Sequence, residues 1–224
     1  TAKDLESLQH RPARVTLDSR HAGRKPLPTG FNLSLPGVLV MYLLMNLLTF
    51  GGVALAWERT HGVLRRIQVH PVARRELIGG KIYGLLLLGL AQIAVLLLAG
   101  RFLFGVRLGD ALGGVLLCLA VHAWVSASLG VLIGSLVRSE DRVVGVAVLA
   151  SLVMAALGGC WWPLEIVPDH VRLAAHAIPT GWAMDALHQL ITYGNGLSGA
   201  WQEIATLAGF GLAANVLAAR GFRT

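Results

Sequence analysis

Charged side chains are scarce in this sequence. Asp, Glu, Lys and Arg make up only 14% of its 224 residues, whereas hydrophobic residues make up 55%, and the mean hydropathy is +0.65. Typical soluble domains contain about 25% charged residues, so this composition excludes an ordinary water-soluble fold. It indicates a helical protein that crosses a membrane several times.

A nucleotide-binding motif is also missing. The phosphate-binding pattern G-x-x-x-x-G-K-[ST] does not occur anywhere in the chain. The nearest segment is Gly79-Gly80-Lys81, but Ile82 follows it and Arg75 stands where the first glycine is required. We therefore expect no ATP site and no other cofactor site on this chain.

Cysteine and histidine are too few or too scattered to indicate a metal site. Cys118 and Cys160 each lie within an apolar run, which is typical of small buried side chains rather than of a disulfide or a pair of metal ligands. His170, His176 and His188 do not form H-E-x-x-H or another tight ligand spacing. We expect no bound metal.

Long uncharged runs dominate the sequence instead. A helix needs about 20 apolar residues to cross a hydrocarbon core of ~30 Å. The predicted spans cover residues 35–56, 82–104, 111–137, 143–162 and 200–219. The sequence thus predicts an all-α integral membrane protein, with about five visible spans in one domain at 35–224. The polar, proline-containing residues 1–34 are expected to be a linker or the tail of an external domain.

A few polar and small residues interrupt the predicted spans. Asn46 and His122 are expected to form interhelical hydrogen bonds. Ser126, Gly130 and Gly134 recur every four residues, which places small residues on one helix face for close packing. Helix packing is the favoured interpretation of Asn46, His122, Ser126 and Gly130, with a substrate path as the alternative.

The main cluster of positive charge lies between the first two spans. Residues 58–81 carry six of the nineteen Lys and Arg residues, so this stretch must remain at a water-facing surface. The positive-inside rule places it in the cytoplasm together with the C terminus, and places residues 1–34 outside. The same rule explains the net charge of +7 without a nucleic-acid partner.

Part of this basic stretch has the pattern of an amphipathic helix. Val63, Leu64 and Ile67 fall on one helical face, whereas Arg65 and Arg66 point elsewhere. Such a helix lies in the membrane interface, and here a proline at position 71 would end it. Its basic residues could bind anionic lipid headgroups or dock a cytosolic partner.

Residues 163–193 contain apolar pieces that are too short to span a membrane. A central Asp in such a piece would cost about 2.5 to 3.5 kcal/mol on insertion. We expect two short helices at the external side, either re-entrant or lying on the surface. Asp169 and Thr180 are predicted to cap them, and Pro168 and Pro179 to break the chain before them.

Two separated motifs resemble the permease subunits of type-2 ABC exporters. The first is Glu58-Arg59-x-x-Gly62-x-Leu64 with Pro71, Glu76 and Gly80-Lys81, similar to the family signature E-R-x-x-G-T-L…P…E…G-K. The second is Pro163-Leu164-Glu165-x-x-Pro168 with Pro179-Thr180, similar to the external region of the family. Val63 replaces the usual Thr, and Arg65 stands where an acidic residue is common. The resemblance covers about residues 29–223 and lacks the first of the six family spans.

The resemblance implies a function for these segments. In that family an amphipathic coupling helix, here at about 58–71, connects the spans to a separate ATPase subunit that holds ATP and Mg. The coupling residues implied are Glu58, Arg59, Gly62, Leu64, Arg65, Arg66 and Pro71, and the external lid would contain Pro163, Glu165, Pro168 and Pro179. The chain would be a non-catalytic exporter subunit in the bacterial inner membrane. It would pair with a second copy or with a related permease.

Two other classes of function stay open. The segment Gly196-Leu197-Ser198-Gly199 resembles the G-x-S-G of rhomboid proteases, which suggests an intramembrane serine hydrolase using Ser198, Asp185 or His188. No histidine follows Ser198 to activate it, so the resemblance to rhomboid proteases fails and a Gly/Ser turn is the better interpretation. A membrane scaffold or channel without a partner is the other alternative. The cargo is not specified, although apolar spans suit an amphipathic or lipid-like molecule better than an ion; the family that the chain resembles also has sodium exporters.

Overall fold

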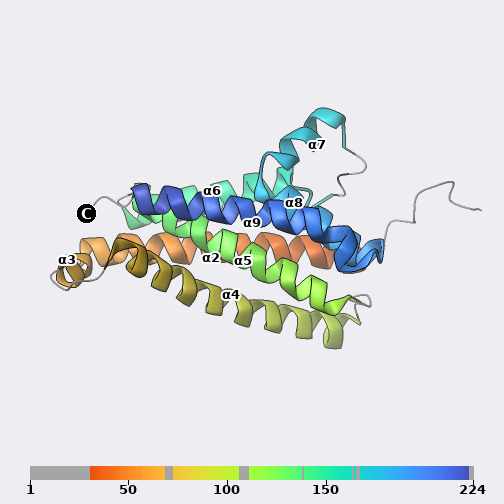
Figure 1. Ribbon diagram of the computed structural model, residues 1–224, viewed down its shortest axis with the longest axis horizontal. Coiled ribbons are helices and arrows are strands. Elements are labelled where there is room, and N and C mark those ends of the chain that lie inside the picture. Colours follow the sequence, from red (N-terminus) through yellow and green to blue (C-terminus); the bar gives the residue numbers. More distant parts are fainter. Residues whose placement is uncertain are drawn as a thin grey trace, which may run out of the picture.

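A computed structural model describes residues 31–68, 73–105, 111–137, 139–162, 164 and 167–221, and the part of the chain that it describes contains helices and no strand. Long helices lie side by side in a bundle (Figure 1). The short helix α3 (Val63–Gln68) lies at one end, and α7 (Asp169–His176) projects near the other. We call these the α3 end and the α7 end.

Five long helices build the bundle. They are α2 (Phe31–Thr60), α4 (Arg74–Phe104), α5 (Leu112–Leu136), α6 (Glu140–Leu157) and α9 (Gly196–Gly221). Four of the described helices, namely α2, α4, α5 and α9, are long and apolar enough to cross a membrane. The chain is therefore a multi-pass membrane protein with an all-α fold.

The fourth predicted span, 143–162, is shorter than the sequence suggests. Helix α6 ends at Leu157, and its first turn contains Glu140, Asp141 and Arg142. Its uncharged part is only about 22 Å long at ~1.5 Å per residue, less than the ~30 Å of a hydrocarbon core. The helix ends where it does because two glycines follow, and the second, Gly159, adopts a φ of 80°.

The charged segment after the first span extends the two long helices on either side of it. Helix α2 continues to Thr60 and thus includes Glu58 and Arg59. Helix α4 already begins at Arg74, eight residues before the expected span at 82, because the basic segment continues the apolar helix into water without a break.

Helix α5 occupies the centre of the bundle and packs against α2, α4 and α9. Glycine allows its backbone to approach α2. A Cβ atom on Gly130 would lie 2.4 Å from the carbonyl oxygen of Leu47, and one on Gly134 would lie 2.7 Å from that of Gly52. These small residues thus permit direct backbone contact between the two helices, as at other membrane helix interfaces.

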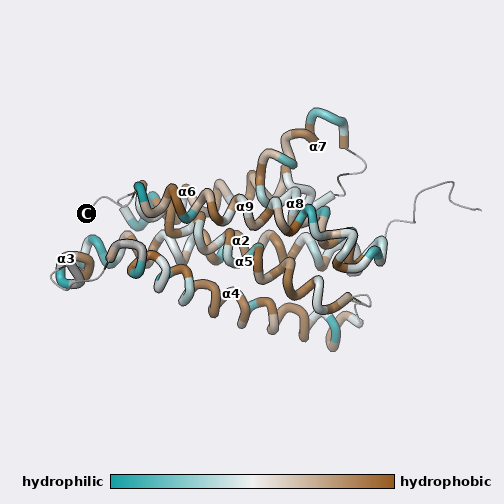
Figure 2. The backbone as a smooth tube through the Cα atoms, in the orientation of Figure 1, coloured by the Kyte–Doolittle hydropathy of each residue, from teal (hydrophilic) through white to brown (hydrophobic). Residues whose placement is uncertain are grey.

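Apolar side chains also cover the outside of the bundle. Figure 2 shows hydrophobic residues along the long helices and hydrophilic residues mainly at α3, α7 and the helix ends. Val95, Phe102 and Leu149 are 65%, 76% and 65% exposed. Apolar surface this extensive is costly in water and suits a lipid environment.

The α7 end contains α7, α8 (Pro179–Leu187) and the π-helix η1 (His188–Thr192). Helix α7 projects from the bundle, whereas α8 is largely buried against α9, α5 and α2. The predicted caps are wrong. Asp169 lies inside the first turn of α7 and pairs with Arg172 at 2.7 Å, and the hydroxyl of Thr180 donates to the carbonyl of Met154 at 2.7 Å. Thr180 bonds across to α6 because α8 is packed against that chain segment.

Candidate functional site

Helix α3 is a six-residue amphipathic segment that links α2 to α4. Leu64 is only 5% exposed and packs with Leu55, Ile78 and Ile82, whereas Arg66 is exposed. The helix is shorter than the predicted 58–71, because Gly62, with a φ of 71°, separates it from α2. The Arg65 side chain and Pro71 lie outside the described residues.

An ion pair joins the two helices that flank α3. The ammonium of Lys81 on α4 bonds to the carboxylate of Glu58 on α2. The side chains are only 15% and 22% exposed, so the pair is partly shielded from water. It therefore holds the end of α2 against the beginning of α4 more firmly than an exposed pair would.

Further polar contacts connect α2 to the rest of the bundle at the α3 end. The guanidinium of Arg59 donates to the carbonyl oxygens of Val137 and Ser135, both at 3.3 Å. These carbonyls are at the end of α5, where no further turn of the helix can donate to them. The hydroxyl of Thr60 donates to the carboxylate of Glu140 on α6 at 3.0 Å. Glu58 and Arg59 both belong to α2. Their contacts hold the end of α2 against α4 and α5, next to α3.

The predicted external lid is only partly described. Pro163 and Glu165 lie outside the described residues, Pro168 is exposed at the start of α7, and Pro179 is buried as the first residue of α8.

A histidine joins α7 to α8. The two ring nitrogens of His176 lie 2.7 Å from the carbonyl oxygen of Arg172 and 2.7 Å from the carboxylate of Asp185. The indole N–H of Trp182 donates to the backbone carbonyl of His176 at 2.8 Å. Burial lowers the pKa of His176, but the two acceptors outweigh it and raise that pKa above 6.5. Since both neighbours of the ring accept, the protonated form is the one that satisfies this site.

The four predicted path or packing residues do not share one location. Asn46 lines an open groove of about 440 Å³ between α2 and α4, together with Tyr42 and Gln92. His122 and Ser126 are fully buried: the Nε2 of His122 bonds to the carbonyl of Val40 at 3.1 Å, and Ser126 donates to the carbonyl of His122 at 2.8 Å. Gly130 contacts the backbone of α2. Of the four, Asn46 lines the groove between α2 and α4, whereas the other three are buried in α5, where His122 and Gly130 contact α2.

Two polar residues of α9 were missed in the sequence. Glu203 and Asn215 each have a buried side-chain oxygen without a hydrogen-bond partner among the described residues. Both interrupt an apolar run, and a polar group inside a membrane segment is costly unless it serves packing or function. That interruption was the signal available in the sequence.

The alternative of a serine hydrolase is not supported by the contact of its nucleophile, since Ser198 bonds to a backbone carbonyl rather than to a base. Ser198 is exposed, and its hydroxyl donates to the carbonyl of Asn195 at 3.4 Å. Asp185 bonds to His176, and His188 is 5% exposed within η1. Across the described ranges, His, Cys, Asp and Glu also form no group of three that could hold a metal ion.

Comparison with known proteins identifies relatives along most of the chain. The family model described as ABC-2 family transporter protein matches residues 3–220. Linearmycin resistance permease protein LnrN of Bacillus subtilis is 24% identical over 86% of this chain and 49% of its own length. Inner membrane transport permease YhhJ of Escherichia coli is 25% identical over 83% of this chain and 50% of its own. The chain thus spans about half the length of these two permeases.

Proposed function

This chain belongs to the ABC-2 family of transporter proteins, and on that premise we propose that it is the membrane subunit of an ATP-driven exporter, coupled to a separate ATPase. Family membership makes it a transport permease subunit. The word resistance in the name of the Bacillus relative supports export, since resistance follows when a toxic compound is removed from the cell. The sequence has no phosphate-binding loop, so ATP and Mg would bind to the partner.

The observation that carries this proposal is the position of α3. Its apolar face, through Leu64, is fixed to α2 and α4, while its basic face, through Arg66, is free to meet water or a protein. Exposed Arg142 and Arg220 lie at the same end of the bundle. The positive-inside rule therefore favours the cytosol for this end, which includes the end of α9.

The contacts around α3 suggest how movement of an ATPase would reach the spans. A push on α3 acts on α2 and α4 through the packing of Leu64 and the ion pair of Glu58 with Lys81. Thr60 extends the connection to Glu140 of α6. In this mechanism α2 and α6 tilt together and open a path at an interface with a second permease copy or a related permease.

The remaining parts of the proposal concern the outer side and the setting. The α7–α8–η1 segment would form the external lid, in a bacterial inner membrane. An amphipathic or lipid-like cargo fits the apolar spans, and no nucleic-acid partner is required.

Transport in inside-out vesicles tests this proposal. Vesicles that contain the chain and a coexpressed ABC ATPase should accumulate a neutral amphipathic fluorophore when ATP is supplied. Arg66→Ala should lower the ATP-dependent rate, while Arg142→Ala, which removes an exposed charge at the same end but outside α3, should not. Uptake equal to that of vesicles lacking the chain would refute the exporter assignment.

A further inference from the structure

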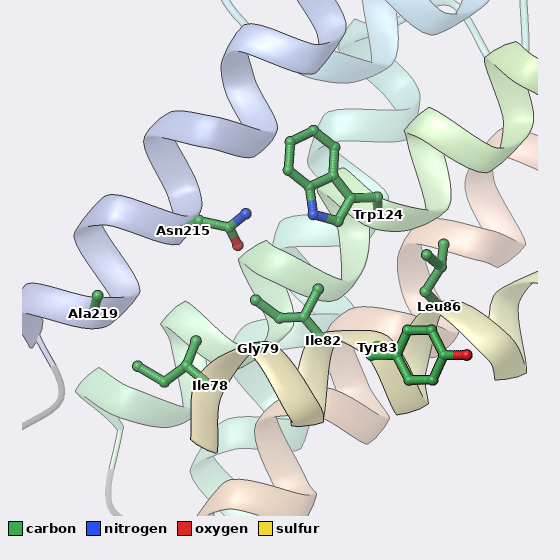
Figure 3. Close-up of a pocket in the computed structure, with 8 residues that line it drawn as sticks. All are labelled: Ile78, Gly79, Ile82, Tyr83, Leu86, Trp124, Asn215 and Ala219. Carbon is green, nitrogen blue, oxygen red and sulfur yellow. The ribbon is translucent and has the colours of Figure 1, made fainter. Parts of the chain in front are cut away.

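A second groove, of about 380 Å³, lies between α4, α5 and α9 in the half of the bundle nearest the α3 end. Ile78, Ile82 and Leu86 line it from α4, Trp124 from α5 and Ala219 from α9 (Figure 3). It exists because α4 packs on α5 and α2 but hardly touches α9. From Ile78 to Leu86 the groove follows α4 for about 12 Å at ~1.5 Å per residue.

One polar group inside this apolar groove has no partner. The side chain of Asn215 extends from α9 into the groove, and its Oδ1 is buried without a hydrogen-bond donor among the described residues. A buried carbonyl left without a donor is destabilising, because it has lost its hydrogen bond to water. Figure 3 also shows the indole nitrogen of Trp124 on the side of the ring that faces Asn215. The groove thus presents an acceptor and a donor within apolar walls.

We propose that this groove binds a neutral, long-chain alcohol, with its alkyl chain along α4 and its hydroxyl at Asn215 and Trp124. A hydroxyl both donates and accepts, which matches the carbonyl of Asn215 and the N–H of Trp124. No Asp, Glu, Lys or Arg lines the groove, so an ionic ligand would lose its water without gaining a partner. The acyl chain of a phospholipid ester has no donor and leaves Asn215 unsatisfied.

This site adds a class of ligand, neutral long-chain alcohols, to the proposed exporter function. That it would load cargo from the cytosolic leaflet rests on the proposed function, whereas the binding itself requires neither ATP nor a partner. Binding and transport can therefore fail separately. If the probe binds but no transport is seen, the exporter proposal is refuted and the proposed binding site is not.

Quenching of Trp124 fluorescence tests the proposal in purified protein. The probes are a dibrominated octadecanol and the matching dibrominated octadecane, which differ only in the hydroxyl. The alcohol should bind at least about three- to tenfold more tightly, the value of one of the two neutral hydrogen bonds of its hydroxyl. Trp124→Phe should remove the part of the fluorescence that the probes quench, which would show that this fluorescence comes from Trp124.

Matched variants separate this site from general binding to the apolar surface. Gly79 lines the groove and has open space where a Cβ would lie, so Gly79→Leu should fill the groove and abolish quenching by both probes. Gly84 is equally open but lies outside the groove, so Gly84→Leu should leave quenching unchanged. Asn215→Leu should remove the preference for the alcohol. Equal affinity of the wild type for both probes, or quenching that survives Gly79→Leu, would overturn the proposal.

Discussion

At the scale of single residues, the α3 end depends on charges that are paired within the chain. Glu58 and Lys81 look in the sequence like two members of a basic surface segment, but in the structure they bond to each other across two helices. Arg59 likewise bonds to the end of α5. Their effect on coupling is therefore expected to be indirect, through the position of α3.

Breaking this ion pair should destabilise the protein. Glu58→Gln leaves the partly buried ammonium of Lys81 without its counter-charge, which should cost about 1 to 2 kcal/mol, less than the 3 to 5 kcal/mol of a fully buried pair. The midpoint of thermal unfolding in detergent measures the loss. Asp141→Asn, at an exposed acid of the same end, serves as the control and should have little effect. If both variants have the same midpoint, the ion pair does not hold α2 to α4.

His176 should make the junction of α7 and α8 sensitive to pH. Its pKa is raised in the folded protein, so protonation stabilises the junction fully below the unfolded pKa of 6.5, and this stabilisation is lost as the pH rises through the higher folded value. Asp185 on α8 and Arg172 on α7 are the charged groups that influence it, with opposite effects. Hydrogen-exchange protection of α7 should therefore be greater in mild acid than in mild alkali.

Two variants decide whether His176 causes that response. Asp185→Asn removes the carboxylate acceptor and should flatten the change in protection with pH. His170→Gln changes an exposed histidine of the same helix and should leave the change intact. A response that persists in Asp185→Asn would exclude this ion pair as its origin.

At the scale of helices, the close contact of α2 with α5 sets the architecture of the core. Gly130 has no room for a side chain, since even a Cβ atom would meet backbone atoms of α2. Gly130→Val should therefore force the helices apart and cost about 3 kcal/mol or more. Gly145→Val on α6 is the matched control, because a Cβ there meets nothing within 4 Å. Thermal unfolding should show a large loss only for the first variant, and equal stability of the two would contradict the packing described.

Helix positions could be predicted from the sequence where hydrophobicity alone decides them. The apolar runs at 35–56, 82–104 and 200–219 lie within helices long enough to span a membrane, and the run at 111–137 extends one residue beyond such a helix, α5, at each end. The early end of α6 was missed because the apolar run continues past Gly158 and Gly159, and hydropathy does not register their turn.

Long-range partners could not be predicted in the same way. The basic, amphipathic character of α3 is visible in its own six residues, since Leu64 and Arg66 occupy different faces of one helix. The bond of Arg59 to Val137 connects residues 78 positions apart, and only the folded bundle brings them together. The side-chain carbonyl of Asn215 has no hydrogen-bond donor among the described residues. The sequence could not predict this, because it depends on how α4 and α9 pack.

At the scale of the whole molecule, the protein is a membrane bundle with α3 at one end and the α7–α8–η1 segment at the other, which are the input helix and the external lid of the proposed function. The α3 end joins α2, α4, α5 and α6 through the contacts of Glu58, Arg59 and Thr60. Force applied at α3 would thus reach most of the bundle. The central claim is that a separate ATPase binds this end.

Copurification with a coexpressed ABC ATPase tests that claim most directly. The affinity-tagged chain should retain the ATPase in detergent, and Arg65→Ala with Arg66→Ala should reduce the amount retained. Arg142→Ala, with its charge at the same end but outside α3, should retain as much ATPase as the wild type. A wild-type chain that retains no ATPase, or an α3 variant that retains as much as the control, would contradict the account.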